Sequence, residues 1–161
     1  MLVFALQTPG LGAVAKFVES SYDLRANRAP LLDVNERELL EKAELLIPAD
    51  AVIINNPWNG GALAEAITGR EVLIPHTGGN YPEAGYTLID GIAEGDWEAC
   101  EIAADINAYW VLDFGKKYVF EGTPRAVPFE NISGIDPKQA PALTERARVD
   151  KAVLYEVTGC P

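Results

Sequence analysis

The sequence predicts an α/β fold: a three-layer sandwich around a largely parallel, Rossmann-like sheet, with an antiparallel hairpin at its C-terminal end. Three observations support this prediction. Short β-branched runs lie between turn residues, as the buried strands of parallel sheets do. Amphipathic stretches separate those runs, which is the order of a βαβ unit. The chain closes with two alternating segments around a two-residue turn, which is a hairpin pattern.

The N-terminal residues differ from the rest, so we assign residues 35–161 to the α/β domain and treat residues 1–34 as a helix and a linker. Apolar residues at helical spacing predict the helix at 11–22, whereas 23–34 are polar and contain a proline. The apolar run at 2–6 has no basic residues before it and is therefore not a signal peptide. It is either a core strand or the end of a membrane helix.

A helix and then a βαβ unit are expected next. Asn35 and Glu38 have the spacing of a capping box, which predicts a helix over 35–46. The run at 51–56 is apolar and β-branched, as a buried strand is. A helix and a second strand are expected after it, at 62–67 and 71–75.

The C-terminal half predicts two helices, a third buried strand, a long surface loop and the hairpin. Asp96 is the expected N-cap of the second helix, and Asp150 and Lys151 form the expected hairpin turn. The helices are expected at 83–93 and 96–107, the strand at 109–114, the loop at 115–136, and the hairpin strands at 144–149 and 152–157.

The acidic composition excludes several classes of partner. The net charge is −11, from 24 acidic and 13 basic residues. Nucleic acids and anionic lipids both require clustered Lys and Arg, so we expect neither as a partner. No run of about 18 apolar residues is present that could span a bilayer. No His and Cys cluster marks a metal site, and we expect neither a metal nor a cofactor.

The two cysteines, Cys100 and Cys160, have two interpretations. They are either unrelated buried thiols or the partners of one disulfide bond, which would suit an oxidising compartment. The position of Cys160 favours the disulfide, because little else in the sequence would hold the C-terminus.

Three loops follow the predicted parallel strands, and ligands of open α/β sheets bind beyond the carboxyl ends of such strands. We expect the loops at Asn55–Gly61, Pro75–Tyr81 and Asp113–Lys117 to converge if the strands are neighbours. They contain none of the glycine patterns of dinucleotide-binding or phosphate-binding loops.

Five residues of these loops are candidates for ligand contact: Asn56, Trp58, Asn59, His76 and Asp113. An indole can stack on a sugar ring, the amides can bond hydroxyl groups, and the histidine can donate a hydrogen bond or exchange a proton with the aspartate. The competing interpretation is structural: Trp58 fills the edge of the core, Asn59 caps a helix, and a lone histidine after a strand stabilises its loop. No serine lies on a strand-to-helix elbow, so we assign no catalytic residue.

Four segments of the chain resemble a family of large actinobacterial multi-pass membrane proteins of uncharacterised function: Pro48–Gly61, Gly69–His76, Tyr109–Gly115 and Leu154–Cys160. The chain is similar to their C-terminal soluble domain, and their membrane portions are similar to C-type glycosyltransferases, which use lipid-linked sugars at the outer face. The resemblance implies that residues 1–34 follow a removed membrane region. It also implies a location on the extracytoplasmic face of the cell membrane.

The resemblance implies an accessory role. Catalytic acidic residues in such transferases lie on loops between membrane helices, so we expect no catalysis by this domain alone. The implied partners are its own transmembrane region and an envelope glycan or a polyprenyl-linked sugar. Two alternatives stay open: a structural module that packs on its membrane domain, and a small hydrolase that pairs His76 with Asp113.

Overall fold

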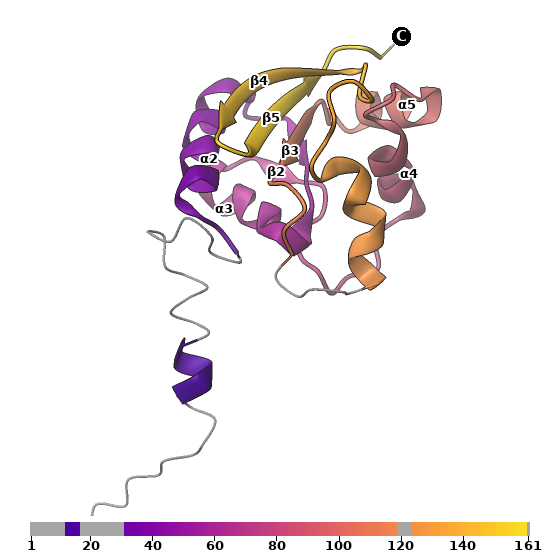
Figure 1. Cartoon of the computed structure of the whole chain (residues 1–161). Coiled ribbons are helices and arrows are strands. Elements are labelled where there is room, and N and C mark those ends of the chain that lie inside the picture. The colour runs from indigo at the N-terminus through magenta and orange to yellow at the C-terminus, as the bar shows by residue number, and fades with distance from the viewer. Residues whose placement is uncertain (1–11, 17–30, 119–123, 161) are drawn as a thin grey trace, which may run out of the picture.

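The computed structural model describes residues 12–16, 31–118 and 124–160. Its centre is a five-stranded sheet with the strand order β2-β1-β3-β5-β4 (Figure 1). Residues 12–16 are helical, within the helix predicted at 11–22, and the rest of that prediction lies outside the described residues. None of the described helices is both long and apolar enough to cross a bilayer.

The N-cap of the first long helix, α2 (Val34–Leu46), lies two residues earlier than predicted. The cap is Asp33, whose carboxylate accepts hydrogen bonds from the backbone N–H groups of Asn35 and Glu36. Glu36 completes the capping box by accepting the Asp33 N–H at 2.7 Å. The prediction that Asn35 and Glu38 form this box is therefore wrong. The earlier start places Leu32, at 4% exposure, in the core.

The parallel half of the sheet is built from β1 (Val52–Ile54), β2 (Glu71–Val72) and β3 (Trp110–Asp113). β1 lies between the other two and pairs in parallel with both. A short crossover joins β1 to β2. It consists of the 3₁₀ turns η1 (Pro57–Asn59) and η2 (Gly61–Leu63) and the helix α3 (Ala64–Thr68).

The other half of the sheet is antiparallel. β5 (Ala152–Val157) pairs with β3 on one side and with β4 (Leu143–Val149) on the other. The hairpin was predicted, and its turn places Asp150 at a φ of 53°. Two of the four strand pairings are thus parallel and two are antiparallel, so the sheet is mixed. The sheet was predicted to be largely parallel, and parallel pairing is found only in its β2-β1-β3 part.

Each face of the sheet carries its own hydrophobic cluster, because successive strand side chains point to opposite faces. Ile53 and Leu154 belong to one cluster, with residues of α2 and α3. Ile54 and Tyr155 belong to the other, with residues of α4 (Glu83–Gly91) and α5 (Trp97–Asp105). Figure 1 shows these two groups of helices on opposite sides of the strands.

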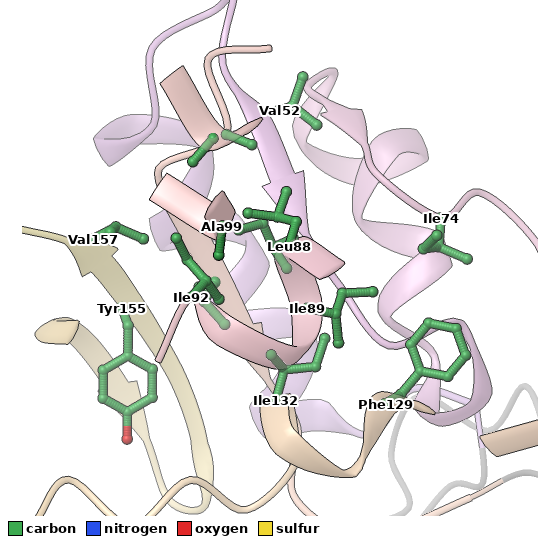
Figure 2. Packing of buried hydrophobic residues seen from close by; sticks show 14 of the residues in the cluster. Val52, Ile74, Leu88, Ile89, Ile92, Ala99, Phe129, Ile132, Tyr155 and Val157 are labelled. Atoms are coloured by element: carbon green, nitrogen blue, oxygen red, sulfur yellow. The ribbon is translucent and has the colours of Figure 1, made fainter. Parts of the chain in front are cut away.

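A 3₁₀ helix, η3 (Pro124–Ile132), lies where a long surface loop was predicted at 115–136. It is part of the core: Ala126, Phe129 and Ile132 are at most 5% exposed. Figure 2 shows Phe129 and Ile132 in the cluster that contains Ile89 of α4. The loop prediction is therefore wrong for this segment.

A disulfide bond joins Cys100 of α5 to Cys160, with 5.6 Å between the two Cα atoms. It fastens the chain that follows β5 to the helical layer beside it. Asp96 caps α5 as predicted, by accepting hydrogen bonds from the N–H groups of Glu98 and Ala99.

Candidate functional site

The carboxyl ends of β1, β2 and β3 meet at one edge of the sheet, where a network of buried polar side chains joins the three loops. Asn55 bridges the first two loops: its Nδ2 donates to the Ile74 carbonyl at 2.9 Å, and its Oδ1 accepts from the Ile74 N–H at 2.9 Å. The side chain thereby continues the pairing of β1 and β2 after the strand hydrogen bonds end. Asn55 is fully buried.

Asn56 ties the first loop to η3. Its Oδ1 accepts from the Trp58 N–H at 2.8 Å, and its Nδ2 donates to Ser133 Oγ at 2.8 Å. The serine hydroxyl donates in turn to the Phe129 carbonyl at 2.8 Å. This chain of hydrogen bonds is buried, so Asn56 positions η3 against the loop that contains Trp58.

Asn59 ties the first loop to the third. Its Nδ2 donates to the Gly115 carbonyl at 3.3 Å, and its Oδ1 accepts from the Gly61 N–H at 3.3 Å. Gly60 lies between them with a φ of +92°. A Cβ on Gly60 would stand 1.5 Å from the Leu31 carbonyl oxygen. The segment before α2 therefore packs directly on this loop, and only glycine fits there.

Asp113 ends β3 and holds the third loop to the segment after η3. Its Oδ1 accepts from the N–H groups of Gly115 and Gly134, both at 2.7 Å, and its Oδ2 accepts from Ile135 at 2.8 Å. The residue is 2% exposed. Three backbone donors satisfy the buried carboxylate, as its burial requires.

A cleft of about 350 Å³ opens beside this network, between the loop at 75–81 and η3. Trp58 and Phe129 are among its lining residues, although they are buried at 7% and 3% exposure. Tyr86 joins Phe129 with 6.2 Å between ring centroids and a 58° tilt. The lining consists of Pro57, Trp58, His76, Thr77, Gly78, Gly79, Asn80, Tyr81, Tyr86, Arg125, Pro128 and Phe129.

The rim loop from His76 to Tyr81 is closed on itself by the Tyr81 hydroxyl. That hydroxyl donates to the His76 carbonyl at 2.5 Å and accepts from the His76 N–H at 3.2 Å. It also lies 2.9 Å from His76 Nδ1. Because the single proton of the hydroxyl bonds the His76 carbonyl, the imidazole Nδ1 donates to the hydroxyl oxygen. In the neutral imidazole, Nε2 is then a hydrogen-bond acceptor.

The structure divides the five sequence-predicted residues into two groups. Trp58 and His76 line the cleft, whereas Asn56, Asn59 and Asp113 belong to the buried network beneath it. Within the described residues, no hydrogen bond joins His76 to Asp113, whose carboxylate bonds only backbone N–H groups. The acid–base pair of the hydrolase hypothesis is not formed.

Among the lining residues that were not predicted as ligand contacts, four have aromatic or charged side chains: Tyr81, Tyr86, Arg125 and Phe129. Phe129 had a recognisable signal, because Ala126, Phe129 and Ile132 recur every third residue, which is the 3₁₀ period. No signal in the sequence distinguished Tyr81 and Tyr86 from tyrosines of the core.

The N-terminus of α2 carries a carboxyl, that of Glu36, whose pKa departs strongly from its usual value. Burial raises the pKa of Glu36 to about 7, and the ion pair that its Oε2 makes with Lys117 Nζ, at 2.5 Å, opposes that rise. The pair fastens the third loop to the N-terminus of α2. No group of three or more His, Cys, Asp or Glu side chains suited to a metal ion occurs in the part of the chain that the structure describes.

Comparison with known proteins gives the family and supports the fold. The chain matches the family of unknown function DUF6541 over residues 1–159, and it belongs to that family. No curated protein matches it. Its fold is similar to that of the C-terminal globular domain of an oligosaccharyltransferase from Archaeoglobus fulgidus. The identity is 13% and the TM-score 0.53, over 78% of this chain and 98% of that chain. At this identity the similarity concerns the fold alone.

Proposed function

We propose that this DUF6541 domain is an extracytoplasmic accessory domain of a membrane glycosyltransferase-like protein, and that its cleft binds a saccharide. The observation that carries the proposal is the cleft itself: aromatic walls and polar loop groups beside the carboxyl ends of parallel strands. The fold that the domain shares with part of an oligosaccharyltransferase supports a role in glycosylation.

The lining of the cleft matches the two kinds of surface that a sugar ring presents. The C–H face of a ring packs on apolar aromatic surface, which Trp58, Tyr86 and Phe129 supply. The hydroxyl groups require donors and acceptors, which the imidazole of His76 and the amide of Asn80 supply at the rim. A volume of about 350 Å³ is at the small end of ligand sites, so the cleft fits one or two rings of a longer glycan.

The buried network gives this site a rigid floor. Asn55, Asn56 and Asp113 fasten the loops to one another and to η3 through hydrogen bonds that leave little freedom for rearrangement. A preformed site avoids the entropic cost of ordering loops on binding. We nevertheless expect weak affinity, near the millimolar range, because an open cleft covers only part of a ring.

The membrane setting of the proposal rests on the family resemblance of the four sequence segments and on the disulfide. A disulfide persists in an oxidising compartment, such as the outer side of a cell membrane, and is rare in the cytosol. The domain's own transmembrane region would hold the cleft near the site of glycosyl transfer, while the catalytic groups lie in that region.

The test is a two-dimensional NMR titration with envelope oligosaccharides that follows the indole N–H signals. Trp58 lies in the cleft, whereas Trp97, at 68% exposure, lies on α5 and serves as an internal control for non-specific stacking. We expect saturable shifts at Trp58, Tyr81 and His76 and none at Trp97. Equal shifts at both indoles, or no shift at any ligand concentration up to about 10 mM, would refute saccharide binding.

The second candidate function is a structural module that packs on its membrane domain. Asn56, Asn59 and Asp113 favour it, because their side chains serve the fold alone. The exposed Leu45 and Trp97, at 85% and 68%, supply apolar surface for such packing. A silent titration, together with protection of Trp97 when the transmembrane region is present, would select this candidate.

A further inference from the structure

We infer that the cleft selects anionic saccharides over neutral ones: Arg125 holds a carboxylate or phosphate group on a sugar whose ring packs against the aromatic walls. The inference deepens the proposed function and rests on it. It names the class of ligand, an acidic sugar or a sugar phosphate, and the residue that discriminates.

The cleft differs in charge from the molecule as a whole. Acidic residues outnumber basic ones by 24 to 13 in the chain, yet the cleft lining contains no Asp or Glu and does contain Arg125. Three other hollows of the described surface each carry carboxylates. Two of them share Asp90 and Glu130, and a third is lined by Glu65 and Glu71.

Arg125 differs from the other described arginines in the contacts of its guanidinium. Arg37, Arg146 and Arg148 each pair with a carboxylate. Arg70 donates from all three guanidinium nitrogens to backbone carbonyls. Arg125 is exposed at the cleft, and within the described residues no hydrogen bond or ion pair engages its guanidinium. Its donors are thus available to a ligand.

The opposite rim of the cleft carries polar groups that can hold a sugar ring. His76 Nδ1 is held by the Tyr81 hydroxyl at 2.9 Å, so the imidazole is oriented before a ligand arrives. Asn80 and Thr77 add an amide and a hydroxyl to the same rim. The imidazole Nε2 can accept from a sugar hydroxyl, and the amide and the hydroxyl can donate to neutral and anionic oxygens alike. These groups therefore hold the ring, and the choice between charged and neutral ligands falls to Arg125.

A guanidinium suits this role because its planar fork matches a carboxylate or a phosphate with two parallel hydrogen bonds. The net charge of −11 repels anions at long range. That repulsion is screened over about 8 Å at physiological ionic strength, whereas the contact with Arg125 is made at hydrogen-bond distance. The contact with Arg125 therefore outweighs the long-range repulsion of an anionic ligand.

The experiment measures dissociation constants at an ionic strength of about 0.15 M for three probes that share a glucose ring: methyl glucoside, glucuronate and glucose 1-phosphate. We expect at least one of the two anions to bind about tenfold more tightly than the neutral sugar. The two anionic arms distinguish a carboxylate ligand from a phosphate ligand.

Two matched variants test whether Arg125 causes the preference for anionic sugars. Arg125→Gln should reduce the affinity for the anion to that for methyl glucoside and leave the neutral sugar unchanged. Arg37→Gln removes the same charge from the exposed face of α2, where it pairs with Glu41, and should leave all three constants unchanged.

Three results would contradict the inference, and they differ in what else they imply. Equal affinity for neutral and anionic sugars overturns it and leaves saccharide binding intact. A preference for anions that survives in Arg125→Gln, or is lost equally in Arg37→Gln, overturns the assignment to Arg125. Failure of all three probes to bind overturns the proposed function as well.

Discussion

Two sets of polar side chains lie within a few residues of one another at the carboxyl ends of the parallel strands, and they differ in what their polar atoms contact. The first set is the buried network of Asn55, Asn56, Asn59 and Asp113. Its members are at most 2% exposed and bond to backbone or to one serine. The second set is the cleft rim, His76 to Tyr81 with Arg125, which faces solvent.

The comparison shows that residue type alone does not identify a binding residue. An asparagine or aspartate after a strand has the right chemistry for a ligand, and it has equally the right chemistry for the backbone groups that a strand leaves unpaired where it ends. At this edge of the sheet, the buried side chains are used to hydrogen-bond backbone groups. The proposed ligand contacts therefore fall to the side chains of the rim, where fewer backbone groups compete.

The largest effect should come from Gly60→Ala, which breaks the buried network. Alanine at this positive φ costs about 1–2 kcal/mol, and its Cβ would overlap the Leu31 carbonyl oxygen. We expect a loss of at least about 4 kcal/mol in the free energy of unfolding, measured by urea denaturation. Gly69→Ala is the matched control: its φ is +65° with no neighbouring atom within 4 Å, so it should lose only the backbone part. Equal losses in the two variants would contradict the contact with Leu31.

The next effect should come from Asp113→Ala, which leaves three buried N–H groups without their acceptor. We expect a loss of about 3 kcal/mol in the free energy of unfolding. Asp136→Ala on the following turn removes an exposed carboxylate that accepts one backbone N–H, and it should lose less than about 1 kcal/mol. A stable Asp113→Ala protein that loses only ligand binding would show that Asp113 belongs to the site instead.

Stability should also depend on pH through Glu36. The pKa of this carboxyl is about 7 in the folded protein and near 4.5 when unperturbed, so the folded state holds a proton that the unfolded chain releases between those values. The free energy of unfolding should therefore fall as the pH rises from about 4.5 to 7, by about 2 kcal/mol.

The control for this pH dependence is a pair of variants on the same helix. Glu36→Gln keeps the capping geometry and should flatten the pH profile. Glu41→Gln, at an exposed position, should leave the slope as it is in the unmodified protein. Stability that rises over this range would mean that the ion pair with Lys117 outweighs burial and that Glu36 is charged throughout.

The smallest effect should come from the rim. Tyr81→Phe removes the hydroxyl that closes the His76–Tyr81 loop, and the free energy of unfolding should fall by about 1 kcal/mol. Amide exchange at Thr77 and Gly78 should become faster. Tyr86→Phe is the control, since its hydroxyl makes no hydrogen bond to the described residues, and it should change neither quantity. Unchanged exchange in Tyr81→Phe would show that the loop keeps its shape without this contact.

Much of the sheet could be predicted from the sequence, because short β-branched runs such as Val52–Ile54 and an alternating hairpin carry strong local signals. The hairpin was also expected to lie against the parallel strands as an antiparallel edge, and it does so. Which parallel strand it pairs with was not predicted, since the contact between β5 and β3 joins residues distant in the chain. The start of α2 was misplaced because Asp33 and Glu36 offer the same capping spacing as Asn35 and Glu38. Burial of Leu32 distinguishes them, and burial is a tertiary property.

Less of the candidate site could be predicted. The convergence of the three loops followed from the parallel strands, and Trp58 and His76 do line the cleft. Arg125 was missed because the prolines and charges around it resembled a surface loop. The roles of Asn56 and Asn59 depend on Ser133 and Gly115, partners more than 50 positions away in the sequence.

The position of β5 in the sheet also bears on how the chain is made. β5 follows the other four strands of the sheet in the sequence, yet it lies between β3 and β4. Until residues 152–157 have left the ribosome, β3 has an open edge with unpaired backbone groups, which is a surface prone to aggregation. The parallel half therefore has to wait for β5. Cys160, which forms its disulfide only after that strand has emerged, then locks the completed sheet to α5.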